Sequence, residues 1–149
     1  MRWSIENRVG RLVEIVMASR MTVDEMVQFR TRMWSVLSQI AGKAVIVVDL
    51  RRAEMFSQDV AERLLQMLKT DNPKVERSAY VLEGAASFTL QVERIIREAA
   101  LGGEKGRVPV RQTFRDPKLA EAFAGELLDA AEREQLQRFM TALTPKTRS

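Results

Sequence analysis

The centre of the sequence holds an uninterrupted run of apolar, mostly β-branched residues, Ala44 to Val48, which is followed by Asp49 and Leu50. A strand with one exposed face alternates apolar and polar side chains, whereas a strand covered on both faces is apolar throughout. The run therefore predicts a strand at the centre of a sheet, with a layer of structure packed on each face.

Strand-like and helix-like segments alternate around this strand. The first helix begins with a capping box, Thr22 and Glu25, the second with the N-cap candidate Ser57, and the last with Asp116 before Pro117. Such alternation predicts an α/β fold: a mostly parallel, mixed sheet of about five strands with an N-terminal hairpin and about four helices. The expected strands cover about 3–6, 11–17, 44–50, 78–82 and 108–114, and the expected helices about 22–41, 57–70, 87–101 and 116–131.

The pattern of the first helix also predicts which of its side chains are buried. Apolar residues recur at intervals of three and four between Val23 and Ala41, as in a helix with one apolar stripe. Val27 and Trp34 are expected to belong to this buried stripe.

A second apolar stripe lies near the C-terminus, after the expected domain of residues 1–131. Residues 132–143 are expected to form a helical extension, and residues 144–149 a disordered tail. The stripe either packs on the chain's own core or offers an apolar face to a partner or to a second copy of the chain. Its residues are Leu136, Phe139, Met140 and Leu143.

The composition removes most catalytic chemistry. The 149 residues include no cysteine and no histidine, which excludes thiolate nucleophiles, His-based triads and the common zinc sites. We therefore expect no enzyme, no metal site and no cofactor, with Asp49 and Tyr80 as the remaining catalytic candidates. The pair Glu132 and Glu134 does not share a helix face, so we expect both side chains to be solvated.

Charge and hydropathy set the expected partners and location. The 24 basic and 20 acidic residues are scattered, and the nine aromatic residues do not interleave with basic clusters, so nucleic-acid binding is not expected. The N-terminal residues show no apolar core of a signal peptide, and no run approaches the roughly 20 apolar residues that span a bilayer. These features predict a cytoplasmic protein without membrane insertion.

The loop after the central strand is the expected functional site, because ligands of open α/β sheets bind beyond the carboxyl ends of the strands. Arginine and large apolar side chains, which are frequent in interface hot spots, gather there. Alternatively, Met55 and Phe56 pack downward as a staple for the next helix. The predicted partner-binding residues are Arg51, Arg52, Met55, Phe56, Ser57, Gln58 and Asp59, and Ser57 is either an N-cap or a phosphorylation site.

Two strings resemble the STAS-like domains of the SpoIIAA-like and SEC14-related superfamily. The first is Val47 to Leu50 with the helix that Ser57 begins, and the second is Val110 to Asp116, in which Phe114 and Asp116 precede Ala122 and Phe123. The resemblance covers about residues 3–131. It implies a STAS/SpoIIAA-like fold and a regulatory or scaffolding domain whose post-strand loop and following helix face a protein partner.

The chain departs from the phosphorylated members of this group at the acceptor position. An ungapped match from Asp49 and Leu50 places Gln58 and Asp59 where the serine pair stands, with Val60 in place of the usual glycine and Ser57 one position early.

The sequence thus predicts a non-enzymatic interaction module, which binds a protein partner or a second copy of the chain. The alternative is a carrier of a lipid or small apolar molecule, which the SEC14-related side of the resemblance implies.

Overall fold

The computed structural model describes residues 3–101 and 108–143. The expected tail, residues 144–149, lies outside these ranges. In chain order the elements are β1 (Trp3–Glu6), β2 (Leu12–Ser19), α1 (Val23–Ser38), β3 (Ala44–Ala53), α2 (Gln58–Asp71), a 3-10 turn (Asn72–Lys74), β4 (Val75–Val81), α3 (Ala86–Leu101), β5 (Val110–Phe114), α4 (Pro117–Gly125) and α5 (Ala130–Leu143).

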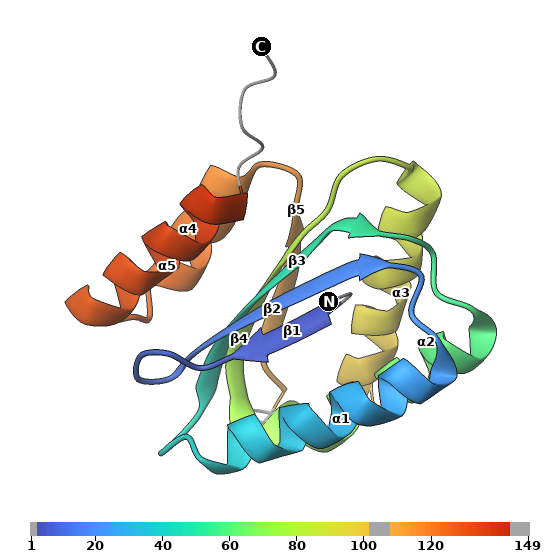
Figure 1. Ribbon diagram of the computed structural model, residues 1–149, viewed down its shortest axis with the longest axis horizontal. Helices are drawn as coiled ribbons and strands as arrows, with labels where there is room; N and C mark the ends of the chain where they lie inside the picture. The colour runs from blue at the N-terminus through green and yellow to red at the C-terminus, as the bar shows by residue number, and fades with distance from the viewer. Residues whose placement is uncertain (1–2, 102–107, 144–149) are drawn as a thin grey trace.

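The strands form one mixed sheet in the order β1-β2-β3-β4-β5, with β3 at the centre (Figure 1). β1 pairs antiparallel with β2 as a hairpin, and the other neighbours are parallel. Helices α1, α2 and α3 pack with Ile46 and Val48 on one face, and α4 and α5 pack with Val45 and Val47 on the other. The apolar run of β3 is therefore covered on both faces, which confirms the predicted α/β class.

Helix α1 begins as its capping box predicts, because Thr22 and Glu25 each accept the other's backbone N–H. The prediction for its buried face is wrong at Val27 and Trp34, which are exposed. Each follows a buried residue, Met26 or Met33, by one position, and one position turns a side chain by about 100° around the helix. The buried stripe is narrower than the apolar pattern.

The described residues form five α-helices rather than about four, because the last expected helix is interrupted. α4 ends at Gly125, and α5 begins after Asp129 with a second capping box, in which Asp129 and Glu132 exchange side chain to backbone hydrogen bonds. Glu132 also accepts the Arg11 backbone N–H at 2.7 Å. It is buried, so the expectation of a solvated Glu132 is wrong.

The turn of the N-terminal hairpin is fitted to this capping residue. Gly10 has a φ of +54°, which favours glycine, and a Cβ there would lie 2.1 Å from the Glu132 carboxylate. The hairpin and the start of α5 are therefore in direct contact, although they lie far apart in the sequence.

The second alternative for the C-terminal stripe, an apolar face offered to another chain, does not hold for Leu136, Phe139 and Met140. All three are buried against the sheet face that carries Val45 and Val47, together with Ala residues of α4. That face would otherwise expose the apolar side of β3 to water, so the chain itself covers it. The side chain of Leu143 lies outside the described part of the structure.

Candidate functional site

The predicted binding segment begins on the central strand itself. β3 continues through Ala53, so Arg51 and Arg52 end the strand rather than start the loop. The buried carboxylate of Asp49 accepts hydrogen bonds from the backbone N–H and from Nε of Arg51, both at 3.0 Å. Arg52 points to solvent. The two arginines therefore differ: Arg51 is held by Asp49, and Arg52 is exposed.

Phe56 anchors the loop by packing into the core against α3. It is 4% exposed, and its ring lies edge-on to Phe88 of α3, with 5.5 Å between the ring centroids. Gln91 of α3 clamps its backbone, because Oε1 accepts the Phe56 N–H at 2.9 Å and Nε2 donates to the Phe56 carbonyl at 2.8 Å. The loop backbone is thus fixed to the helix layer.

Met55 and Phe56, which the sequence treats alike, have opposite roles. Met55 is 44% exposed, whereas Phe56 packs downward as in the staple alternative. Gln58 and Asp59, in the first turn of α2, are exposed as well. The accessible part of the predicted site is therefore Arg52, Met55, Gln58 and Asp59.

Ser57 caps α2. Its Oγ accepts the backbone N–H of Val60 at 3.3 Å, and its own backbone is extended, as an N-cap requires. A phosphate at this position would lie at the N-terminus of α2, where free amides and the helix dipole favour negative charge. Phosphorylation of Ser57 stays a prediction.

Replacing Ser57 by Ala is expected to lower the free energy of unfolding by about 1 kcal/mol, because the Val60 N–H loses its acceptor. Urea denaturation measures this loss. Ser57→Asn, which retains a capping oxygen, serves as the control and should stay near the parent. Equal stabilities for the Ala and Asn variants would show that the cap contributes nothing.

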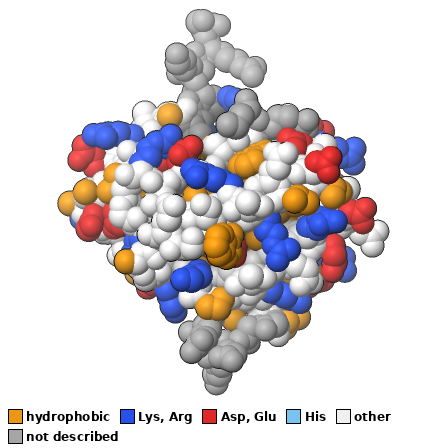
Figure 2. All heavy atoms as spheres, turned by 60° about the horizontal axis from the view of Figure 1, so that its bottom comes forward, with side chains coloured by type: hydrophobic (Ala, Val, Ile, Leu, Met, Phe, Trp, Pro, Cys, Tyr) orange, Lys and Arg blue, Asp and Glu red, His pale blue; other side chains and the backbone are white. Residues whose placement is uncertain are grey.

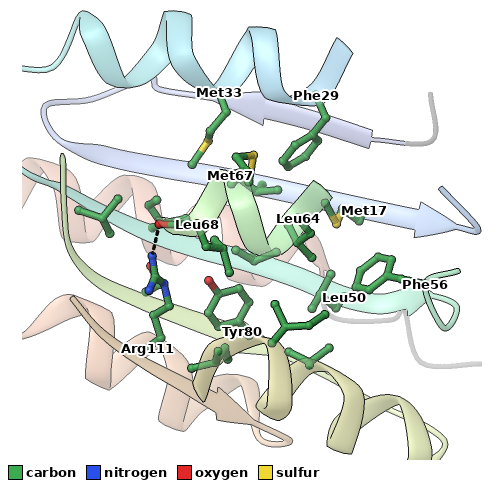
Figure 3. A pocket seen from close by; sticks show the side chains of 18 residues that line it. Met17, Phe29, Met33, Leu50, Phe56, Leu64, Met67, Leu68, Tyr80 and Arg111 are labelled. Carbon is green, nitrogen blue, oxygen red and sulfur yellow. Dashed lines mark hydrogen bonds between the residues drawn. The ribbon is translucent and has the colours of Figure 1, made fainter. Parts of the chain in front are cut away.

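A cavity lies between the sheet and helices α1, α2 and α3, directly beside the anchored loop (Figure 3). Phe56 closes one end and Arg111 of β5 stands at the other, with Tyr80 between them. The walls are otherwise almost entirely apolar and include the flexible side chains Met17, Met33 and Met67. The cavity measures about 40 Å³.

At the polar end of the cavity, some buried N–H groups of Arg111 lack hydrogen-bond partners within the described ranges. Arg111 Nη2 donates to the Leu68 carbonyl at 3.2 Å, but its buried Nε and Nη1 have no hydrogen-bond partner within the described ranges. Burial raises the pKa of Asp71 to about 6, although Arg111 and Arg30 lower it in part. Burial likewise raises the pKa of the Tyr80 phenol, with Arg111 opposing the shift, so the hydroxyl stays protonated.

The two catalytic candidates do not converge. Val48 is the register partner of Tyr80, and both belong to the core under α1, α2 and α3. Asp49 is one residue further along β3, so its side chain points to the opposite face of the sheet. In the part of the chain that is described, no three acidic residues gather where they could hold a metal ion.

Among the described helices, none combines the length and the apolar character needed to cross a bilayer.

Two polar residues of the site region were not predicted. Gln91 shares a stripe of α3 with Phe88, Val92 and Ile95, and a polar residue on such a stripe signals a buried hydrogen bond. Arg111 carries no comparable signal, because its surroundings depend on how β5 docks against the end of α2.

Comparison with known proteins identifies the fold. No family model and no curated protein sequence matches the chain. The structure is similar to an uncharacterized protein of the DUF3478 family, with a SpoIIAA-like fold, from Shewanella loihica PV-4: the TM-score is 0.60, the identity is 16%, and the match covers 82% of this chain and 93% of that one. The anti-sigma factor antagonist SpoIIAA in its unphosphorylated form aligns with a TM-score of 0.48 and 13% identity, over 91% of this chain and 96% of that one. The chain thus has the SpoIIAA-like fold that the two sequence strings implied.

Proposed function

We propose that the chain is a non-enzymatic interaction module of the cytoplasm, regulatory or scaffolding in type, which binds a protein partner through the end of β3, the following loop and the first turn of α2. The observation that carries this proposal is the construction of the loop. Its backbone is held by Phe56 and Gln91, while Arg52 and Met55 project into solvent.

A loop held in this way is suited to binding. Association costs free energy when mobile segments become ordered, and a backbone already fixed to a helix avoids much of that cost. A long guanidinium side chain beside an exposed thioether offers both a charged and an adaptable apolar contact. Gln58 and Asp59 extend the same surface with polar groups, as in the rim of an interface.

The test is retention of the partner by the tagged full chain. Replacing Arg52 and Met55 together by Ala is expected to weaken the complex by about 30-fold or more, as for hot-spot residues. The matched control replaces Arg138 and Leu119, an exposed Arg and an exposed Leu on the α4 and α5 side. Undiminished binding by the first variant, with a parent-like melting temperature, would argue strongly against this surface.

A second candidate function is carriage of a small apolar ligand, which the interior cavity favours. At about 40 Å³ it is well below the roughly 150 Å³ that holds benzene in an engineered cavity, so a lipid tail requires the methionine side chains to move. Mass spectrometry of an organic extract of the purified protein tests this candidate. An empty extract, together with a melting temperature insensitive to lipids, would argue it down.

A further inference from the structure

Two large apolar side chains of α1 face solvent on the same side of the helix. Val27 is 48% exposed and Trp34 is 68% exposed. They are seven residues apart, which places them two turns, or about 10 Å, from each other on one face. Thr31 lies between them and is exposed as well.

These residues line two adjoining hollows between α1 and α2. The first, about 150 Å³, is formed by Met26, Val27, Arg30, Thr31 and Arg63. The second, about 250 Å³, has Trp34, Thr70 and Asp71 in addition to the shared Arg30 and Thr31. The two hollows adjoin at Arg30 and Thr31, and together they are called the α1–α2 groove. Figure 2 looks onto the α1 side of the molecule, where apolar side chains in orange lie beside blue Lys and Arg side chains.

The groove is basic. Its exposed charged residues are Arg30 and Arg63, whereas Asp71 is buried in the wall. The charge of Arg30 lowers the pKa of Asp71 in part. Within the described ranges, neither Arg30 nor Arg63 forms an ion pair within 4.0 Å. The exposed acidic residues Asp59 and Glu62 of α2 lie nearer its N-terminus and do not line the groove.

We propose that the α1–α2 groove binds an acidic amphipathic helix of a protein partner. Apolar positions two turns apart on α1 match partner residues at i and i+7, with i+3 or i+4 over Thr31. The exposed guanidinium groups of Arg30 and Arg63 favour Asp or Glu on the flanks of that helix, because Asp71, which also interacts with Arg111, offsets only part of their charge. Tryptophan and arginine are also the side chains most enriched among interface hot spots. This surface is separate from the β3–α2 loop, and the inference does not depend on the function proposed for that loop.

The test uses a displayed library of random peptides of 16 residues, the length of α1, selected on the full chain. We expect the enriched peptides to carry net negative charge, with apolar residues at i, i+3 or i+4 and i+7. Added to the Trp3→Phe variant, in which Trp34 is the remaining tryptophan, they should shift its fluorescence to shorter wavelength. By calorimetry, Arg63→Glu and Trp34→Ala should each weaken binding by about tenfold or more.

Two control variants separate this groove from other surfaces. Replacement of Arg138 and Leu119, on the far side of the sheet, should leave peptide binding unchanged. Replacement of Arg52 at the end of β3 and Met55 in the following loop, called the loop variant, should also leave it unchanged. If the loop variant loses peptide binding while Arg63→Glu retains it, the peptides bind at the loop. That result would overturn the proposal that they bind in the groove.

Four further outcomes would contradict the proposal. The first two are that no peptide is enriched, and that the enriched peptides show no preference for acidic residues. The third is that peptide binding survives both Arg63→Glu and Trp34→Ala. The fourth is that phosphatidylglycerol vesicles or self-association of the chain, instead of the peptides, shift the Trp34 fluorescence.

Discussion

Replacing Phe56 by Ala is expected to lower the free energy of unfolding by about 3–5 kcal/mol, the usual cost of removing a buried Phe ring. The ring closes one end of the interior cavity and contacts Phe88, so its loss enlarges an existing void that the surrounding side chains do not fill. The neighbouring Met55→Ala should change the free energy of unfolding by no more than about 0.5 kcal/mol, because Met55 is largely solvent-exposed. Urea denaturation of both variants measures the contrast.

This contrast separates the two roles that the sequence leaves open for the pair. If Phe56 anchors the loop, the Phe56→Ala variant is destabilised, and it binds the partner again under conditions that keep it folded. A stable Phe56→Ala variant with lost partner binding would instead make Phe56 a contact residue, and would contradict the anchored loop.

The second large effect concerns Asp71. Burial raises its pKa from 3.8 to about 6 in the folded chain, against the opposing effect of Arg111 and Arg30. The folded state therefore holds this proton more tightly than the unfolded state does. Well below pH 3.8 Asp71 is protonated in both states and no stability is lost. As the pH rises from about 3.8 to about 6, the unfolded state ionises first and the free energy of unfolding falls. Well above pH 6 Asp71 is ionised in both states and the penalty is constant. The difference corresponds to roughly 3 kcal/mol.

Asp71→Asn, which has no such proton, isolates this effect. We expect the parent to lose roughly 2–3 kcal/mol relative to the variant between about pH 4 and pH 7.5, because other carboxylates titrate alike in both proteins. Urea denaturation across this pH range measures the difference between the two curves. If the difference in the free energy of unfolding between the parent and Asp71→Asn stays constant with pH, the pKa of Asp71 is not raised by burial.

The fold could be predicted because its main determinants are local. The apolar run of β3, the capping box of α1 and the Asp116-Pro117 start of α4 each act within a few residues, and the order of elements then leaves few sheets to consider. The break between α4 and α5 had a local signal as well, Asp129 followed by Glu132 three residues later. It was hidden by the apolar stripe that runs across it.

The sequence predicts a candidate site but not the roles of its residues, and its use in binding stays a prediction. The rule that sites lie beyond the carboxyl ends of parallel strands selects the segment, whereas the division between Met55 and Phe56 depends on Phe88 and Gln91, more than 30 residues further along the chain. Val27 and Trp34 were likewise assigned to the core because hydropathy does not show which side of α1 the neighbouring α2 leaves open. Tertiary packing decided both cases.

The most direct test of the proposed function is the native mass of the complex that the tagged full chain retains when it is purified gently from its source cells. We expect a discrete assembly with a second protein, which dissociates when Arg52 and Met55 are replaced by Ala. A lone monomer that carries a bound small molecule would rule out the interaction module and favour the carrier instead.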